Sequence, residues 1–352
     1  MHATSPTTPY LSLFARRSSF LKEHLDAELY TKRRLCKIRY VRKTVYVLPK
    51  DMVPTAFAAT RIMTVPVSQA YAKTFGVTEK QYAETAKQIM QLLKGNGGLT
   101  AKQIRNHLQT SLKISPVVNL MCDQGLLIRG APEKGWKSNL HTYYLLDEYF
   151  PNLKLDAANE EEARKMVVRQ YLASFAPATE NDVSWWTGFT KSQVKRILAE
   201  LKNEISYVDV AVADKALIML SQETAALAAA DSAGAPVVNL VPSLDPYLMG
   251  YKDRERYLDP ARYSYVFDRG GNATATILVD GRVAGVWDFE KPFVKVFLFD
   301  RAEADILGEV HVQAKAVGAF ISGMDVKVKE CVSMVPLTER SAGSVMSPLK
   351  GS

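Results

Sequence analysis

The sequence has few of the features that mark secreted, metal-binding or membrane proteins. Its 352 residues include three cysteines, which lie far apart and lack the paired spacing of a zinc site or a redox motif. No apolar stretch is long enough to span a bilayer, and the N-terminus lacks the apolar core of a secretory signal. The histidines have no metal-ligand spacing, and no Walker loop or dinucleotide fingerprint is present. We expect a soluble cytoplasmic protein without metal or cofactor.

Positive charge is concentrated in the first part of the chain. Residues 1–150 contain 22 Lys and Arg but only 10 Asp and Glu, whereas the remainder contains 23 and 27. The densest run is KRRLCKIRYVRK at residues 32–43, with seven basic residues and no acidic one. This asymmetry favours a polyanionic partner for the first part of the chain. Charge alone is equally compatible with a solvated face that only aids solubility.

The first 150 residues contain two outlines of a winged helix, in which helices are followed by a β-hairpin. Helical patterns at residues 10–17 and 21–31 precede alternating strands at 35–40 and 45–48, which join at a basic turn. A second outline has helices at 81–94, 100–108 and 115–124, then strands at 126–128 and 140–146. Thr100 and Gln103 have capping-box spacing. The loop between the last two strands, with Lys134, Trp136 and Lys137, predicts a second wing.

A third outline and a different C-terminal region follow. Helices are predicted at 167–175, 182–188 and 191–201, and strands at 205–212 and 216–220. Residues 224–235 are Ala-rich and indicate a linker or a loosely held helix. Strands are then predicted at 237–241, 263–267, 274–279, 282–289, 294–299 and 326–332, with a hairpin turn at Asp280-Gly281 and a helix at 302–320. Generic helical bundles are the alternative explanation of the repeated outline.

We therefore predict an α+β fold in which tandem winged helix-turn-helix modules are followed by a C-terminal β-rich domain. The predicted segments are residues 1–78, 79–157 and 158–222 for the three modules, 223–336 for the β-rich domain and 337–352 for a disordered tail.

Three stretches of the sequence resemble a known family. VVNLVPSLDPYLMGYKDRERYLDP, followed by TILVDGRVAGVWDFE, resembles the C-terminal signature of the bacterial winged-helix DNA glycosylases, which include AlkZ-like self-resistance proteins and YcaQ-like repair enzymes. RRLCKIRYVRKTVYVLPKDMV resembles the first wing of this family, although Arg42-Lys43-Thr44 replaces its Arg-Gly-Thr turn. YLASFAPATENDVSWWTGF resembles the start of its third winged helix. The resemblance extends over most of the chain, about residues 10–332.

The resemblance implies a function and a catalytic site. Members of the family excise alkylated purines or unhook interstrand crosslinks without a metal, using a Gln-x-Gln or Gln-x-Asp pair just before a Pro-x-x-Pro-Tyr stretch. Here SPTTPYLSLFARR matches that stretch, and counting back from it puts His2 and Thr4 at the catalytic positions. The helix that precedes the pair in the family has no counterpart here, so the first module is expected to be truncated. Asp245 and Tyr247 lie in the signature, where Asp245 either anchors a turn, which we favour, or completes the active site.

The unusual pair is compatible with the chemistry. The leaving base of an N7 adduct is already cationic, so the protein must mainly position a water and stabilise positive charge on the sugar. A neutral His can act as a general base and a Thr can hold a water. The predicted DNA contacts are basic residues of the first hairpin and of helix surfaces, which suit sequence-independent phosphate binding. These are Lys37, Arg39, Arg42, Lys43, Lys102, Arg105, Lys191, Lys195 and Arg196.

Two functions fit the sequence best. The first is a DNA glycosylase for alkylated purines or crosslinks in double-stranded DNA, acting in repair or self-resistance as a nucleoid-associated monomer. The alternative is a non-catalytic winged-helix regulator that keeps the modules and has lost the chemistry; a scaffold for partner proteins is a third option. The feature that separates the first two is the His2-x-Thr4 pair, because an intact glutamine pair would have favoured the enzyme.

Overall fold

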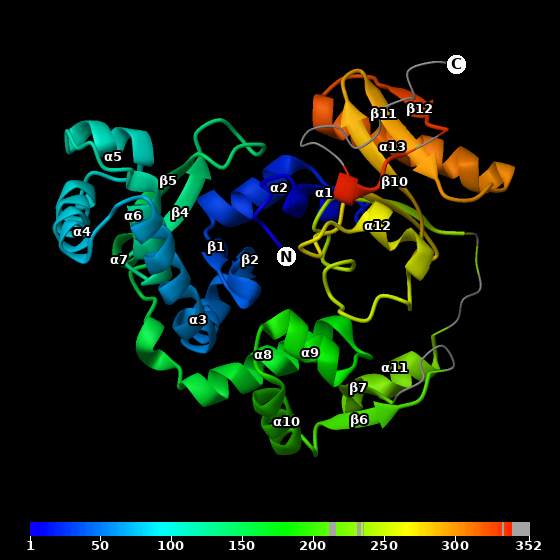
Figure 1. Ribbon diagram of the computed structural model, residues 1–352, viewed down its shortest axis with the longest axis horizontal. Coiled ribbons are helices and arrows are strands. Elements are labelled where there is room, and N and C mark those ends of the chain that lie inside the picture. The colour runs from blue at the N-terminus through cyan, green and yellow to red at the C-terminus, as the bar shows by residue number, and fades with distance from the viewer. Residues whose placement is uncertain (211–215, 231–233, 235, 333, 340–352) are drawn as a thin grey trace. The chain divides into compact units, whose positions relative to one another are not determined.

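The structure, a computed structural model (Figure 1), describes residues 1–210, 216–230, 234, 236–332 and 334–339. The chain divides into two compact units, each built from separate stretches of sequence. The first unit comprises Met1–Thr7, Leu21–Ser174 and Thr187–Asn203, and the second comprises Thr8–Phe20, Phe175–Trp186 and Glu204–Ser352. The borders of these units do not coincide with the consecutive segments predicted above, which stay a prediction.

The first unit contains a five-stranded sheet covered by helices. Its helices and strands are α2 (Lys22–Asp26), a π-helical turn (Ala27–Thr31), β1 (Leu35–Arg39), β2 (Val45–Pro49), α3 (Val53–Thr74), α4 (Glu79–Leu93), β3 (Leu99–Thr100), α5 (Ala101–His107), α6 (Ile114–Asp123), β4 (Leu127–Pro132), β5 (His141–Leu145), α7 (Leu146–Tyr149), most of α8 (Glu160–Phe175) and α10 (Lys191–Glu200). The strand order is β2-β1-β4-β5-β3.

Elements α4 to β5 form the second predicted winged helix. Their order along the chain, helix–strand–helix–helix–strand–strand, is that of a winged-helix module, and β3, β5 and β4 are neighbours in the sheet. Apolar residues from α4, α5, α6, β4 and β5 meet in one buried cluster that includes Ile89, Ile104 and Met121. Thr100 caps α5, and its hydroxyl accepts a hydrogen bond from the Gln103 backbone N–H in a complete capping box, as the spacing predicts.

The hairpin of β1 and β2 extends the same sheet. β1 pairs with β2 on one edge and with β4 on the other, where Lys37 lies opposite Arg129. The sequence pattern predicted a wing here, with basic side chains that reach phosphates. The hairpin is present, and the second edge of β1 is occupied by β4. Within β1, Cys36 and Lys37 are buried.

The structure also differs from the predictions in two helices of the first unit. The 22-residue helix α3 was not predicted; it contains Pro66 in its interior, and its exposed surface includes apolar residues such as Ile62 and Tyr71. These features obscure the separation of polar and apolar faces by which a helix is recognised in a sequence. Helix α6 begins at Ile114, with Lys113 rather than Ser115 at the N-cap.

The second unit is centred on a mixed sheet. Its helices and strands are α1 (Thr8–Phe14), most of α9 (Glu180–Thr187), β6 (Ile205–Val208), β7 (Leu217–Leu220), α11 (Thr224–Ala228), β8 (Val238–Val241), α12 (Tyr263–Val266), β9 (Thr276–Val279), β10 (Arg282–Glu290), β11 (Phe293–Leu298), α13 (Ala304–Ser322) and β12 (Lys327–Glu330). The strand order is β12-β11-β10-β9-β8, and only the β11–β12 pairing is parallel.

Helix α13 packs closely on this sheet (Figure 1). A Cβ atom at Gly318 would lie 2.5 Å from a side-chain carbon of Val326 and 2.6 Å from one of Val294. Glycine is therefore required at this contact. The turn Asp280-Gly281 between β9 and β10 has φ values of 48° and 75°, as predicted for a two-residue hairpin. This part of the unit is the β-rich domain that the sequence predicted.

Other predictions for the second unit are corrected or fall partly outside the described residues. In the stretch 263–267, predicted as a strand, Tyr263–Val266 form the short helix α12. The Ala-rich linker begins as helix α11, while residues 231–233 and 235 are outside the described part, as are 211–215 of the predicted third hairpin and 340–352 of the predicted tail. Short 3-10 turns occupy Val41–Lys43, Lys50–Met52, Leu155–Ala157, Ser221–Glu223, Pro260–Arg262 and Leu337–Glu339.

Within the described ranges, no helix combines the length and the apolar character that a bilayer span requires. In the same ranges, no three His, Cys, Asp or Glu side chains are grouped closely enough to hold a metal ion.

Candidate active site and DNA-binding residues

The predicted catalytic segment lies along the free edge of β2, in the first unit. The Ala3 N–H donates to the Val45 carbonyl at 2.7 Å, the Val47 N–H donates to the Met1 carbonyl at 2.8 Å, and His2 forms an antiparallel bridge with Tyr46. Residues at the start of a chain are usually poorly ordered unless backbone pairing holds them. The backbone pairing with β2 gives His2 and Thr4 defined positions.

The His2 imidazole is almost fully buried against the hairpin. His2 is only 5% exposed, and the centre of its ring lies 5.3 Å from the centre of the Tyr46 ring. Burial, and then the positive charges of Arg42 and the N-terminal amine, lower the pKa of His2 to about 4. The ring is therefore neutral at pH 7. Its Nδ1 accepts a hydrogen bond from the Thr4 N–H at 3.4 Å, which places the ring proton on Nε2.

Thr4 is the exposed member of the pair. Its hydroxyl oxygen accepts a hydrogen bond from the Val45 N–H at 3.4 Å. Its carbonyl accepts a hydrogen bond from the Asn139 side-chain amide at 3.3 Å. Both contacts use oxygens of Thr4 as acceptors, so the hydroxyl hydrogen can be donated to a bound water. His2 thus supports the backbone of Thr4, and Thr4 presents the polar group to solvent.

The turn next to this pair has an unusual backbone. Arg42 and Lys43 have φ values of 51° and 61°, in the left-handed region. Lys43 occupies the position at which the family has glycine, and it is exposed, while Arg42 is half-buried. A side chain in this conformation costs about 1–2 kcal/mol relative to the right-handed one. The substitution of glycine therefore leaves the turn strained and adds a cation to it.

Two predicted DNA contacts of the hairpin are engaged inside the fold. Lys37 is 2% exposed, and burial lowers its pKa to about 8. The Arg39 Nε lies 2.9 Å from a carboxylate oxygen of the buried Asp123, and its guanidinium also donates to the Lys43 carbonyl. We therefore no longer assign Lys37 to the DNA-contacting surface. The cause is packing on this face of the sheet: the π-helical turn Ala27–Thr31 contacts β1, and the Lys37 ammonium group lies 5.7 Å from the centre of the Tyr30 ring.

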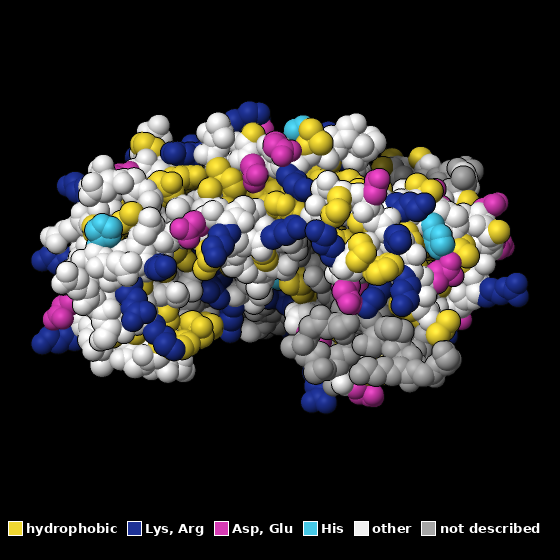
Figure 2. Space-filling model, turned by 90° about the horizontal axis from the view of Figure 1, so that it is seen from above, with side chains coloured by type: hydrophobic (Ala, Val, Ile, Leu, Met, Phe, Trp, Pro, Cys, Tyr) yellow, Lys and Arg dark blue, Asp and Glu magenta, His cyan; other side chains and the backbone are white. Residues whose placement is uncertain are grey.

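The remaining predicted contacts are accessible, with Arg42 the least so. Lys43, Lys102, Arg105, Lys191, Lys195 and Arg196 are exposed, and all belong to the first unit. Arg196 pairs with Glu161 at 3.0 Å, both side chains being more than half exposed, so this pair contributes little to stability. The molecular face in Figure 2 carries numerous Lys and Arg side chains with Asp and Glu side chains interspersed among them.

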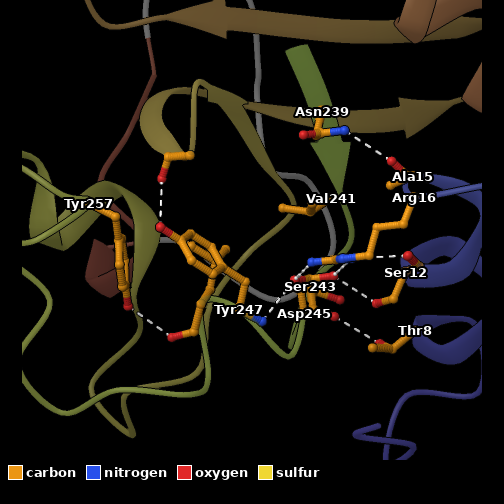
Figure 3. A network of polar contacts seen from close by, with 12 residues as sticks. Thr8, Ser12, Ala15, Arg16, Asn239, Val241, Ser243, Asp245, Tyr247 and Tyr257 are labelled. Carbon is orange, nitrogen blue, oxygen red and sulfur yellow. Dashed lines mark hydrogen bonds and ion pairs between the residues drawn. The ribbon is translucent and has the colours of Figure 1, made fainter. Parts of the chain in front are cut away.

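Asp245, from the signature segment, is the centre of a polar network in the second unit (Figure 3). Its carboxylate is fully buried and accepts hydrogen bonds from Ser12 Oγ at 2.8 Å and from both terminal nitrogens of Arg16 at 2.7 and 2.8 Å. It also accepts one from the Tyr247 N–H at 3.0 Å. A bidentate guanidinium leaves this carboxylate with little capacity to act on a substrate, which supports the anchoring role over the catalytic one.

The same network continues on both sides of Asp245. The Thr8 hydroxyl donates to the Ser243 carbonyl at 2.8 Å and the Asn239 amide donates to the Ala15 carbonyl at 3.0 Å. The Tyr247 hydroxyl donates to the Gly281 carbonyl at 2.9 Å. The signature segment therefore fastens helix α1 to the loop that follows β8 and to the β9–β10 turn. This anchoring role requires a carboxylate and a tyrosine two positions apart, Asp245 and Tyr247, and a basic residue far earlier in the chain, Arg16.

Two features of the functional region were missed in the sequence. Asn139 reaches Thr4 across 135 residues, a relationship that leaves no local pattern. Asp182 forms a reciprocal pair with Thr179 at the start of α9, where its carboxylate accepts a hydrogen bond from the Thr179 N–H. It also accepts from the backbone N–H groups of Lys252 and Asp253 at 2.7 and 2.9 Å. It thereby holds the conformation of the signature loop.

Comparisons with known proteins agree on one family. The profile of the DNA glycosylase AlkZ-like family matches residues 1–320. The chain is similar to an interstrand DNA cross-link repair glycosylase of Streptomyces sahachiroi, with 24% identity over 233 residues; the match spans 62% of this chain and 61% of that protein. The solved structure of the DNA glycosylase AlkZ of Streptomyces sahachiroi has the same fold, with a TM-score of 0.74 and 22% identity over 94% of this chain and 90% of the other. Since the family profile covers almost all of the sequence, the chain belongs to the AlkZ-like DNA glycosylase family.

Proposed function

We propose that this protein is a DNA glycosylase that removes alkylated purines or unhooks interstrand crosslinks in double-stranded DNA. The observation that carries the proposal is the family match over residues 1–320 together with an ordered His2-x-Thr4 segment where the catalytic pair is expected. The similarity to a protein named as an interstrand DNA cross-link repair glycosylase supports the same class of substrate. Repair of DNA or self-resistance to an alkylating compound would be its role, as a cytoplasmic, nucleoid-associated monomer without metal or cofactor.

The proposed reaction is hydrolysis of the bond between C1′ of the deoxyribose and N9 of an N7-alkylated purine. The C1′–N9 bond breaks, its electron pair leaves with the cationic base, a water oxygen bonds to C1′, and the proton of that water passes to solvent. Because the base is already activated, a strong general base is not required. The Thr4 hydroxyl holds the water, and the neutral His2 ring fixes the Thr4 backbone through its Nδ1.

Binding of the duplex is assigned to the exposed cations of the first unit. Phosphate contacts position a protein without reading the base sequence, which suits an enzyme that must find lesions anywhere. Lys43 is close to the catalytic segment, because it lies two residues before Val45, whose N–H bonds the Thr4 hydroxyl. Arg42 contributes charge at the same turn. Such binding should weaken as salt concentration rises, because phosphate contacts release counterions.

The test is release of base from a duplex that carries one N7-methylguanine, measured by chromatography under single-turnover conditions. We expect release by the unaltered protein and a fall of about tenfold or more in Thr4→Val, which removes the hydroxyl and keeps the shape. Thr190→Val is the control for folding effects of a lost threonine hydroxyl, since Thr190 caps α10. His2→Gln and Thr4→Gln, which introduce the side chain typical of the family, should retain or raise the rate.

The alternative function is a regulator that binds DNA without chemistry. Salt-sensitive binding to undamaged and methylated duplexes with equal affinity, and with no base release by the unaltered protein or by the glutamine variants, would establish that alternative. Release that is unaffected by Thr4→Val would show that the chemistry occurs elsewhere in the protein.

A further inference from the structure

The loop between β4 and β5, residues 133–140, lies beside the proposed catalytic segment. Asn139 in this loop donates a hydrogen bond to the Thr4 carbonyl, so its neighbour Leu140 is close to the reacting position. Leu140 is 53% exposed, although large apolar side chains are normally withdrawn from water. Single exposed leucines are common, but this one adjoins the residue that bonds Thr4, where an apolar part of the substrate would cover it.

The loop is held rigidly by its own hydrogen bonds. The Leu140 N–H donates to Ser138 Oγ at 3.0 Å, and its carbonyl accepts from the Glu133 N–H at 2.8 Å. The Ser138 N–H donates to the Gly135 carbonyl at 3.0 Å, and Gly135 has a φ of 74°, which completes the reversal of the chain. Both backbone groups of Leu140 are thereby used, and its side chain is presented on a fixed support. Such preorganisation lowers the entropy lost on binding.

The charges around Leu140 match a polyanion. Lys134 and Lys137 are exposed in the loop, with Glu133 as its one acidic residue. The ammonium groups of Lys22 and Lys137 lie 5.1 and 5.4 Å from the centre of the Trp136 ring, a geometry in which the indole attracts cations. The ring therefore keeps two ammonium groups near the loop tip. A duplex carries negatively charged phosphates on its surface and stacked, apolar bases in its interior. An apolar side chain with lysines nearby therefore matches both parts.

We propose that Leu140 is a wedge that enters the base stack beside the damaged nucleotide while the surrounding lysines contact its phosphates. The inference deepens the proposed function and rests on it, because the wedge is placed relative to the proposed catalytic residue Thr4. Proteins that kink or open a duplex insert apolar side chains between base steps, at a cost of a few kcal/mol in stacking. Insertion next to Thr4 would loosen the lesion from its neighbours and bring C1′ within reach of the bound water. The wedge would also discriminate damaged from undamaged DNA. A base step that contains a cationic or crosslinked base is weakened, so opening it costs less free energy.

The experiment measures unstacking directly and does not depend on base release. A duplex carries 2-aminopurine, whose fluorescence rises when it unstacks, next to N7-methylguanine, and a matched duplex carries an undamaged guanine. Binding is followed separately by fluorescence anisotropy. We expect the full-length protein to raise the 2-aminopurine signal at saturation. Leu140→Ala should reduce that rise about fivefold or more while changing the Kd less than about threefold, because phosphate contacts dominate affinity.

Two further variants make the result specific. Leu140→Met keeps an apolar side chain of similar length and should restore most of the signal. Leu227→Ala removes another surface leucine, 39% exposed on α11, and should leave the signal unchanged. A fluorescence rise in Leu140→Ala equal to that of the unaltered protein overturns the proposal, and so does the absence of any rise when the unaltered protein is saturating. Leu140-dependent unstacking without base release would instead retain the wedge and reject the glycosylase activity.

Discussion

The side-chain amide of Asn139 donates a hydrogen bond of 3.3 Å to the backbone carbonyl of Thr4. These residues come from the β4–β5 loop and from the segment that pairs with β2, and the bond joins them within the first unit. One wing therefore supports the proposed catalytic position without contributing a reacting group. Asn139 is a positioning residue in this description.

Removal of this support should affect turnover more than binding. In Asn139→Ala we expect kcat for base release to fall about tenfold with KM nearly unchanged, because small displacements of a water-holding group are costly. Asn139→Gln retains an amide donor and should recover part of the loss. Asn106→Ala, which removes an exposed asparagine from α5, is the control. An equal change in KM and kcat, or no change in either, would contradict the positioning role.

The strained turn at Lys43 makes a prediction about stability. Glycine adopts a φ of 61° without the steric cost that a side chain pays. Lys43→Gly should therefore be more stable than Lys43→Ala by about 1 kcal/mol, measured as the difference in free energy of unfolding in urea. Both variants lose the same charge, so they should weaken DNA binding equally. Equal stability of the two variants would show that the turn relaxes to an ordinary conformation.

The buried carboxylate of Asp245 should be important for folding. In Asp245→Asn the Arg16 guanidinium loses its bidentate partner, and we expect a loss of roughly 2–3 kcal/mol, below the full value for a buried pair because Arg16 is 41% exposed. Asp300→Asn disrupts the Arg262–Asp300 pair, where Asp300 is 85% exposed, and should cost less than about 0.5 kcal/mol. Chemical denaturation monitored by tryptophan fluorescence distinguishes these values. A loss of base release in stable, folded Asp245→Asn would favour a catalytic role.

Acid should destabilise the protein through its buried histidines. The pKa of His2 is lowered from 6.5 to about 4 and that of His141 to about 3, in both cases mainly by burial. The unfolded chain therefore binds these protons first as the pH falls. The contribution of the neutral histidines to the free energy of unfolding is fully present above pH 6.5. It declines between pH 6.5 and 4, by about 3 kcal/mol at pH 4 for His2 alone. Urea unfolding across this range should show a correspondingly smaller decline in His2→Gln; the same decline in that variant would locate the effect elsewhere.

The sequence was most informative where structure is determined locally. The Thr100–Gln103 and Thr190–Gln193 pairs form complete capping boxes, because the interaction involves only residues three apart. The Asp280-Gly281 turn has the expected positive φ values for the same reason. The order of helices and strands in the second module followed from such signals and from hydrophobic spacing. The family resemblance, confirmed over residues 1–320, supplied the assembly of modules.

Predictions failed where contacts between distant residues decide the outcome. The alternation in β1 correctly indicated a strand but placed Lys37 in solvent, since no local signal reveals that the turn Ala27–Thr31 packs against β1. Tyr263–Val266 has the aromatic and β-branched residues of a strand, yet forms a helix, because tertiary packing overrides β propensity. The proline inside α3 concealed that helix. The assignment of His2 and Thr4 to catalysis, and of the exposed cations to DNA binding, stays a prediction that the assays above address.

The division of the chain into interleaved units limits how the gene can be rearranged. The second unit includes Thr8–Phe20 as well as Glu204–Ser352, and Arg16 from the first of these stretches neutralises Asp245 in the second. A polypeptide starting at residue 204 would carry a buried anion without its counter-charge, and one ending there would lose the framework that receives α1. Recombination at the middle of the gene should thus yield two defective products.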